Sequence, residues 1–123
     1  MALLLYVCTG NTCRSPMAAA LSPGIFGSSI SVSSAGTLES GRPANPRAVE
    51  VISKRRIDIS SHRSRNVFEA LQPLPDLIIG LASEHIRTVV DSRHELFGRA
   101  FTLKEFVRRA KEVGPRHPGE ELD

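Results

Sequence analysis

The residues with the clearest chemical potential are clustered near the start of the sequence. The segment Cys8-Thr9-Gly10-Asn11-Thr12-Cys13-Arg14-Ser15-Pro16 holds both cysteines of the chain, and five residues separate the first of them from the arginine. A cysteine thiolate is a strong nucleophile, and the planar guanidinium of arginine binds two oxygens of one phosphate. Cys8 and Arg14 on a single turn of chain could therefore hold a phosphate and attack its phosphorus.

Two elements must position this segment. Leu3–Cys8 is a continuous apolar run, which is typical of a strand buried on both faces of a parallel sheet. Arg14–Leu21 follows with helical spacing, and Ser22-Pro23-Gly24 predicts that this helix ends early. Between the strand and the helix, Gly10 and Asn11 tolerate left-handed backbone angles. We expect this turn to direct several backbone N–H groups into one concavity.

Such a concavity would suit both a phosphate and an ionised sulfur. Unpaired N–H groups and the positive end of the helix dipole bind tetrahedral anions. In the same field cysteines have pKa values of roughly 3.5–7.5 instead of about 8.5, so Cys8 is predicted to be a thiolate at neutral pH. Ser15 could donate a hydrogen bond to that sulfur, and Arg14 could hold two phosphate oxygens during the transfer.

The rest of the chain alternates strand and helix signals, which predicts an α/β fold. We expect further strands at Ile30–Ser33, Asp76–Leu81 and Ala100–Phe101, and further helices that start at Asn45-Pro46, Ser83 and Thr102, the last of them ended by Gly114-Pro115. Alternating strands and helices form right-handed βαβ units, which build a parallel sheet covered by helices. Ligands of such sheets bind beyond the carboxyl ends of the strands, where Cys8 lies.

The segment from Val7 to Ala18 resembles the phosphate loop of the low-molecular-weight protein tyrosine phosphatase family, with Cys-x5-Arg directly after an N-terminal strand. Ser34-Ala35-Gly36-Thr37, Asp58–Arg65 and Phe101–Val107 resemble further family segments, so the likeness covers most of the chain. It implies a three-layer sandwich with a four-stranded parallel sheet, the Rossmann-like phosphotyrosine phosphatase I fold. It also implies transfer of a phosphoryl group to Cys8 and hydrolysis of the phosphocysteine, with neither a metal nor a cofactor.

The resemblance assigns roles to the residues of the loop. Cys8 is the nucleophile and Arg14 holds the phosphate in the transition state. The other residues expected to bind the phosphate are Thr9, Gly10, Asn11, Thr12, Cys13 and Ser15. Ser34 is expected to brace Asn11. The substrate would be a phosphorylated protein, and free phosphate or another oxyanion would occupy the same loop.

Thr12 bears on the choice of substrate. Tyrosine-directed members of the family usually have a branched apolar residue at this position, whereas the branch similar to bacterial protein arginine phosphatases has Thr. A hydroxyl near the scissile bond tolerates a polar guanidinium better than an aliphatic side chain does. Because Thr and Ile are also similar in shape, the residue could be neutral, and phosphotyrosine and phosphoarginine both stay open at this point.

Cys13 has two interpretations as well. In the family, a second cysteine at this position can form a reversible disulfide with the nucleophile, which would spare Cys8 from irreversible oxidation by peroxide. The alternative is a small apolar side chain packed at the start of the helix.

The sequence departs from the family at two places. Family members carry a general acid in a late Asp-Pro dipeptide, but this sequence has no Asp-Pro and ends at Asp123. We expect residues 1–123 to form a single phosphatase-like domain that is cut short at its C-terminal end, with the acid supplied by Asp123 or by a missing tail. The second departure is the break at Ser22-Pro23-Gly24, which would shorten the wall beside the pocket.

Composition narrows the partners and the location. The formal charge of +3 favours anionic ligands weakly, and the lack of Trp argues against a stacking platform for nucleic acid. The apolar run Ala2–Val7 is too short to span a membrane and lacks the features of a secretory signal. Two cysteines are too few for a disulfide-stapled secreted fold, which favours the cytoplasm, and no metal site is predicted. The oligomeric state stays open.

The histidines and most basic residues are interpreted as structure. The seven Lys and Arg residues between Arg42 and Arg65 could steer acidic phosphoprotein segments, although such a run is more often a solvated face. We interpret His62 as part of a solvated basic loop, and the alternative is a catalytic histidine. The other histidines, which we place on the surface, are His85, His94 and His117.

Three functions compete on these observations. The leading one is a cysteine-dependent protein phosphatase that acts on phosphotyrosine or phosphoarginine. Arsenate reductases of resembling fold use the same loop, but they usually need further cysteines late in the chain, and none follows Cys13. The third is a catalytically weak phosphate-binding module, which the lack of a general acid would produce.

Overall fold

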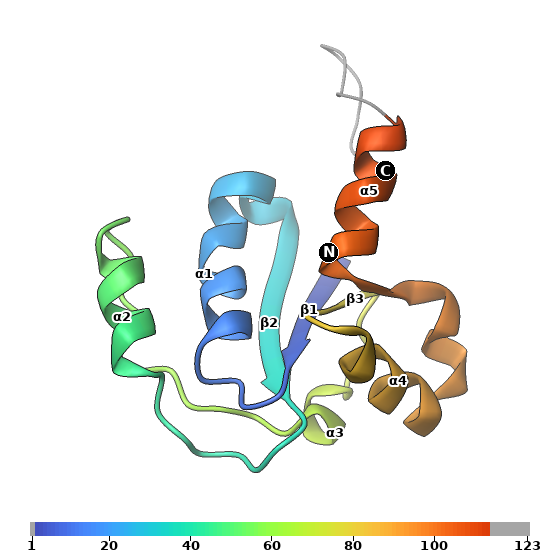
Figure 1. Cartoon of the computed structure of the whole chain (residues 1–123), viewed down its shortest axis with the longest axis horizontal. Coiled ribbons are helices and arrows are strands. Elements are labelled where there is room, and N and C mark those ends of the chain that lie inside the picture. Colours follow the sequence, from blue (N-terminus) through green and yellow to red (C-terminus); the bar gives the residue numbers. More distant parts are fainter. Residues whose placement is uncertain (1, 114–123) are drawn as a thin grey trace.

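A four-stranded parallel sheet forms the centre of the structure, a computed structural model that describes residues 2–113 (Figure 1). The strands are β1 (Ala2–Cys8), β2 (Ile30–Gly36), β3 (Leu77–Gly80) and β4 (Ala100–Thr102), in the spatial order β2-β1-β3-β4. Cys8 pairs with Gly36 and Val7 pairs with Gly80, so the three strands end at one edge of the sheet. The predictions that concern Gly114-Pro115, His117 and Asp123 lie outside the described residues.

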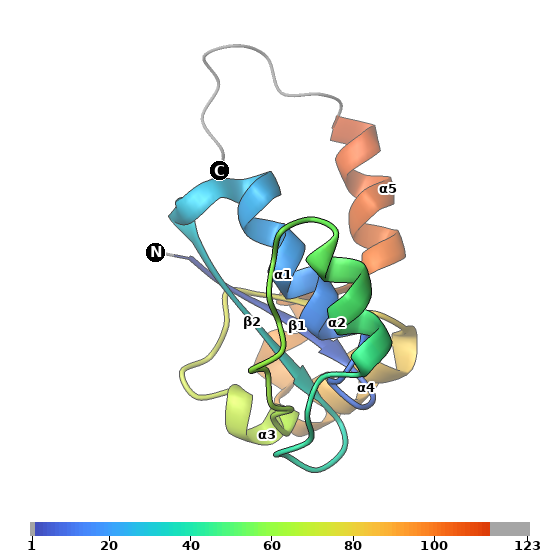
Figure 2. The same cartoon turned by 90° about the vertical axis from the view of Figure 1, so that its left-hand side faces the viewer.

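Helices cover both faces of the sheet, as Figures 1 and 2 show from two sides. The α-helices are α1 (Arg14–Phe26), α2 (Pro46–Ser53), α3 (Val67–Ala70), α4 (Ser83–Ser92) and α5 (Leu103–Val113), and the 3₁₀-helices are η1 (Gly27–Ser29) and η2 (His94–Arg99). Residues of α1 and α5 pack on one face, residues of α3 and α4 pack on the other, and α2 packs against α1. The predicted three-layer sandwich is confirmed.

The apolar run of β1 supplies both layers of the core. Leu5 and Val7 are buried with Ile78 on the face covered by α3 and α4. Leu4 and Tyr6 are buried on the opposite face, which α1 covers. Because successive side chains of a strand point to opposite faces, a continuous apolar strand is stable only between two layers.

Helix α1 is longer than the sequence predicts. It continues through Pro23 to Phe26 and is capped by Gly27, whose φ of 70° is readily adopted only without a side chain. The buried hydroxyl of Ser22 lies 2.8 Å from the carbonyl oxygen of Ala18 and 2.8 Å from the hydroxyl of Tyr6, which ties this turn to β1. The predicted shortening of the wall beside the pocket is therefore wrong.

Local capping signals correctly predict the starts of α2 and α5. Asn45 caps α2 by accepting a hydrogen bond from the N–H of Arg47 at 2.8 Å. At α5, the N–H of Glu105 donates to Thr102 Oγ1 at 3.1 Å, and the N–H of Thr102 donates to Glu105 Oε1 at 3.3 Å. The start expected at Ser83 is shifted by one residue, because Ser83 is the first helical residue of α4 and Ala82 is its cap.

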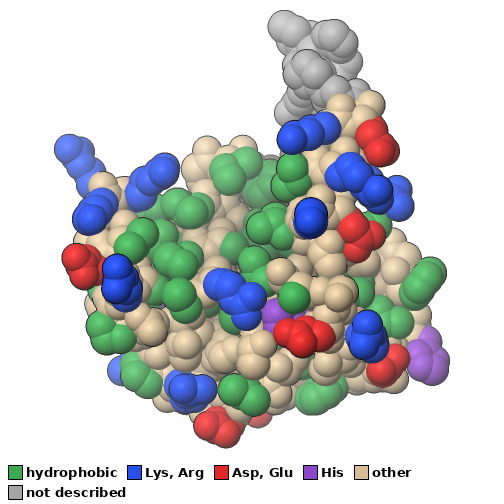
Figure 3. Space-filling model, viewed as in Figure 1, with side chains coloured by type: hydrophobic (Ala, Val, Ile, Leu, Met, Phe, Trp, Pro, Cys, Tyr) green, Lys and Arg blue, Asp and Glu red, His purple; other side chains and the backbone are tan. Residues whose placement is uncertain are grey.

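The surface carries basic side chains over α2 and along α5 (Figure 3). A groove of about 900 Å³ runs between the end of β4 and α5, with apolar walls from Leu81, Leu103 and Val107. None of its lining residues belongs to the segment from Cys8 to Pro16. Within residues 2–113, no helix combines the length and the apolar character that crossing a membrane requires.

Candidate active site

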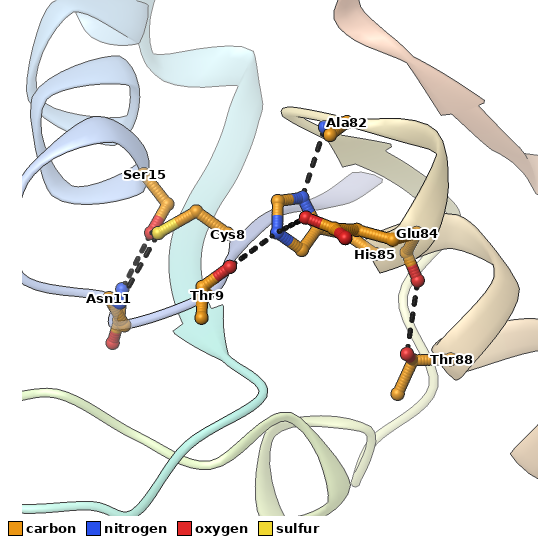
Figure 4. A network of polar contacts seen from close by, with 8 residues as sticks. All are labelled: Cys8, Thr9, Asn11, Ser15, Ala82, Glu84, His85 and Thr88. Atoms are coloured by element: carbon orange, nitrogen blue, oxygen red, sulfur yellow. Dashed lines mark hydrogen bonds and ion pairs between the residues drawn. The ribbon is translucent and has the colours of Figure 1, made fainter.

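The loop from Thr9 to Cys13 connects the carboxyl end of β1 to the first turn of α1 (Figure 4). No side chain caps the start of α1, so its first N–H groups are left for another acceptor. Cys8 is buried at the base of the loop, whereas the Arg14 side chain is exposed. The loop thus has the position and the free N–H groups of an anion site.

Hydrogen-bond donors surround the sulfur of Cys8. The backbone N–H of Asn11 donates to Sγ at 3.2 Å, and the hydroxyl of Ser15 lies 2.9 Å from Sγ. That hydroxyl accepts a hydrogen bond from Asn11 Nδ2 at 2.8 Å, and its single proton has two acceptors, the Cys8 sulfur at 2.9 Å and the more distant Ala35 carbonyl oxygen at 3.4 Å. Both contacts stabilise a negatively charged sulfur more than a neutral one.

Asn11 holds the loop together from a fully buried position. Its backbone adopts a φ of 54°, as the sequence predicts, whereas Gly10 does not adopt a positive φ. Its Oδ1 accepts a hydrogen bond from the N–H of Arg65 at 2.8 Å, and its Nδ2 donates to Ser34 Oγ at 2.9 Å. The contact predicted for Ser34 is therefore present.

The carbonyl groups of the loop bond to the surrounding scaffold. The oxygen of Thr9 accepts from the N–H of Thr37 at 2.9 Å, and the oxygen of Thr12 accepts from the N–H of Asn45 at 2.7 Å. Because N–H and C=O groups of a peptide unit point in opposite directions, carbonyls held on the outside turn the following N–H groups toward the inside. This is the geometry of an oxyanion cradle.

The end of β2 approaches the loop so closely that only glycine fits. A β-carbon on Gly36 would lie 2.6 Å from the backbone oxygen of Thr9 and 2.9 Å from the backbone nitrogen of Asn11. The absence of a side chain at Gly36 therefore lets β2 support the loop.

The interpretation of His62 as part of a solvated loop is wrong. Its ring is half-buried, and Nε2 lies 2.7 Å from the backbone oxygen of Asn11, to which it donates a hydrogen bond. The sequence around His62 gave no local sign of this contact, since the two residues are 51 positions apart.

The prediction that His85 lies on the surface is also wrong. Its side chain is 1% exposed and contacts Thr9 Oγ1 through Nε2 at 2.9 Å. Burial lowers the pKa of His85, the positive charge of Arg14 lowers it further, and the carboxylate of Glu84 opposes the shift. His94 is exposed, as predicted.

The remaining loop residues face other neighbours. Cys13 is half-buried against the apolar side chains between α1 and α2, and both cysteines are free. A β-carbon on Gly10 would meet Thr12 Oγ1 at 3.4 Å and the guanidinium of Arg42 at 3.9 Å, so these two side chains flank Gly10.

The structure thus brings one set of predicted residues into a single hydrogen-bonded network, namely Cys8, Asn11, Ser15 and Ser34. Sequence reasoning missed Gly36, His62 and His85 as neighbours of this network. Over the described residues, no group of three or more His, Cys, Asp or Glu side chains is arranged to hold a metal ion.

Comparison with known proteins identifies similar chains. The sequence profile of the family described as low molecular weight phosphotyrosine protein phosphatase matches residues 3–118. A protein-arginine-phosphatase of Bacillus subtilis (strain 168) is 37% identical over 108 residues, which are 85% of this chain and 71% of that protein.

Solved structures give the same result. An arginine phosphatase from Geobacillus stearothermophilus matches with a TM-score of 0.80 at 34% identity, covering 89% of this chain and 71% of that one. A low molecular weight protein tyrosine phosphatase from T. tengcongensis matches with a TM-score of 0.77 at 38% identity, covering 98% of this chain and 82% of that one. An arsenate reductase of Staphylococcus saprophyticus is similar over a shorter stretch, 38% identical over 81 residues, which are 66% of this chain and 60% of that protein.

Proposed function

Because the chain belongs to the low molecular weight phosphotyrosine protein phosphatase family, we propose a mechanism by which its loop removes phosphoryl groups from proteins. The enzyme is a protein phosphatase of the class that acts on phosphotyrosine or phosphoarginine. The observation that carries the mechanism is the pair of donors on the sulfur of Cys8, inside a loop whose carbonyls bond outward.

In the first step, the thiolate of Cys8 attacks phosphorus. A sulfur–phosphorus bond forms while the bond from phosphorus to the leaving oxygen or nitrogen breaks, and the leaving group takes up a proton from a general acid or from water. The loop N–H groups and Arg14 bind the phosphoryl oxygens, and their charge is stabilised as it spreads in the transition state. The substrate is a phosphorylated side chain of a protein, and free phosphate is an inhibitor that fills the same loop.

In the second step, water attacks the phosphocysteine. The sulfur–phosphorus bond breaks, inorganic phosphate leaves, and the electron pair returns to the sulfur of Cys8. The N–H of Asn11 and the hydroxyl of Ser15 stabilise the returning negative charge, since both lie within hydrogen-bond distance of Sγ. The same two donors therefore act in both steps.

Phosphoarginine is the substrate class that we propose. Thr12 Oγ1 lies beside Gly10 in the loop, so a hydroxyl rather than an aliphatic wall stands at this side of the site. The similarity to arginine phosphatases from two organisms supports this choice. A hydroxyl at Thr12 leaves a polar phosphoguanidinium with a partner, which an Ile side chain would not provide.

The variant Thr12→Ile tests the substrate class against Thr12→Ser as its matched control. We expect T12I to lower kcat/KM for phosphoarginine relative to phosphotyrosine by about tenfold, because one side-chain contact in a pocket changes selectivity by roughly 10–200-fold. T12S should keep the ratio of wild type. An unchanged ratio in T12I would show that Thr12 does not select the substrate.

The phosphatase mechanism is tested by phosphate release from p-nitrophenyl phosphate and from a phosphoarginine protein, in wild type and Cys8→Ser. We expect release by wild type and none by C8S. Release that survives in C8S would exclude the cysteine mechanism. Binding of phosphate without any release by wild type would identify a binding module instead.

Arsenate reduction is the second candidate, because arsenate reductases share part of the sequence. Here Cys8 would form a sulfur–arsenic bond as an arsenic–oxygen bond breaks and water leaves. A second thiol would then attack the Cys8 sulfur, and its electron pair would reduce arsenic, which leaves as arsenite while a disulfide forms. Only Cys13 and external thiols are available for this step, since the chain has two cysteines. Consumption of thiols that depends on arsenate, measured beside phosphate release, separates the two reactions.

We also propose that residues 1–123 act as a single domain in the cytoplasm. A single sheet joins all the strands of residues 2–113, and two free cysteines are typical of a protein from a reducing compartment. Expression of the chain with fluorescence imaging and limited proteolysis tests both points.

A further inference from the structure

His85 is a buried titratable side chain that the two chemical steps do not use. It lies in the first turn of α4, and Figure 4 shows its ring directed toward Thr9, the residue that follows Cys8. The ring is 1% exposed, and both of its nitrogens have partners. A buried polar ring with two fixed partners has a defined protonation state, which these partners reveal.

The partners identify the neutral form with its proton on Nε2. The backbone N–H of Ala82 donates to Nδ1 at 3.0 Å, so Nδ1 must be unprotonated. The remaining proton is then on Nε2, which donates to Thr9 Oγ1 at 2.9 Å. Thr9 therefore accepts from His85, and its own hydroxyl proton is left for an acceptor elsewhere.

We propose that neutral His85 is a positioning residue, which holds the Thr9 hydroxyl and thereby fixes the residue that follows the nucleophile at the start of the loop (Figure 4). The proposal rests on the phosphatase function and names a further residue of that site. Thr9 Oγ1 connects the ring to the start of the loop, while the Ala82 N–H connects the ring to the N-cap of its own helix α4. The phosphate loop is thereby held against α4 on one side, as Asn11 holds it against β2 on the other.

Protonation of His85 would break this arrangement. A proton on Nδ1 would face the N–H of Ala82, which is also a donor. The charged groups around the ring are Arg14 on α1 and Glu84 on α4, whose Oε1 lies 3.7 Å from Nε2, and the titratable neighbour on β1 is Cys8. Burial and Arg14 keep the pKa of His85 below its ordinary value, which preserves the neutral form near neutral pH.

One substitution separates the two ends of the ring. In His85→Asn, the amide oxygen can still accept from Ala82 but the side chain is too short to reach Thr9. We expect kcat of H85N to fall by about tenfold at neutral pH, the effect of one lost hydrogen bond to a charged site, with KM little changed. The exposed His94 provides a matched control, and His94→Asn should keep the wild-type kcat.

A double-mutant cycle tests whether His85 acts through Thr9. Thr9→Val should lower kcat about as much as H85N, and the double variant should be no slower than the slower single variant, because both remove one interaction. Thr9→Ser keeps the hydroxyl and should retain most of the activity. Independent, multiplying losses in T9V and H85N would overturn the proposal.

The pH dependence of kcat distinguishes this positioning role from a role in stability alone. The ratio of wild-type kcat to H85N kcat should decline toward one as the pH falls and His85 of wild type becomes protonated. A ratio that stays constant over pH, after correction for the folded fraction, would overturn the proposal. A different result would contradict the phosphatase mechanism itself, namely phosphate release that persists in C8S.

Discussion

The contact between β2 and the phosphate loop predicts a large effect of one methyl group. In Gly36→Ala, the new β-carbon would lie 2.6 Å from the Thr9 oxygen and 2.9 Å from the Asn11 nitrogen. Carbon and oxygen normally approach to about 3.3–3.6 Å, so the loop would have to move by roughly 0.7–1.0 Å. Backbone atoms form the obstacle, and no side-chain rotation can relieve it.

The displacement should affect catalysis more than folding. Overpacking of a tight site costs about 1–3 kcal/mol of stability. A misplacement near 1 Å in a catalytic constellation costs about 10²-fold in rate. We therefore expect G36A to unfold at a somewhat lower temperature and to lose about 10²-fold in kcat for p-nitrophenyl phosphate, at temperatures where it remains folded.

Gly24→Ala is the matched control for this experiment. Gly24 lies within α1, and a β-carbon there would have no neighbour within 4 Å. Alanine inside a helix is favoured over glycine by roughly 0.5–1 kcal/mol, so G24A should be fully active and slightly more stable. The reasoning fails if G36A, folded and monitored by circular dichroism, retains the kcat of wild type.

Further predictions concern the loop supports, pH and oxidation. Asn11→Ala removes three side-chain hydrogen bonds and leaves Ala at a φ of 54°, so we expect about 2–4 kcal/mol of destabilisation in urea unfolding, against about 1 kcal/mol for Ser34→Ala. Folding lowers the pKa of His85 from 6.5, so the unfolded state binds more protons in acid. The stability that neutral His85 contributes is therefore present above pH 6.5 and is lost as the pH falls through the lower folded pKa. H85N should remove this part of the pH dependence of the unfolding free energy. Peroxide should inactivate wild type with the mass change of one disulfide and thiol should restore activity, whereas Cys13→Ser should stay inactive; wild type without that mass change would refute the switch.

The sequence predicts the elements that depend on local signals. The apolar run of β1, the Asn45 cap and the Thr102–Glu105 capping box each act within a few residues, and the structure has all of them. The phosphate loop is also predicted by local sequence, because its glycine, asparagine, cysteines and arginine lie within seven consecutive positions. Local preference and tertiary structure agree at these positions.

The features that the sequence does not predict depend on contacts between distant residues. Thr9 and His85 are 76 positions apart, and only the pairing of β1 with β3 brings α4 beside the loop. Gly36 reads as an ordinary turn residue until its pairing with Cys8 shows the close approach. The end of α1 was misjudged because Ser22 bonds to Tyr6 of β1, a tertiary contact that outweighs the local preference of Pro23.

The central claim is that Cys8 carries the phosphoryl group between the two steps. Rapid acid quenching of wild type during turnover of p-nitrophenyl phosphate, followed by mass spectrometry of the peptides, tests it directly. The account predicts one phosphoryl group on the sulfur of Cys8, in an amount that appears before steady-state phosphate release. Continued turnover with an unmodified Cys8, or a phosphoryl group on another residue, would contradict it.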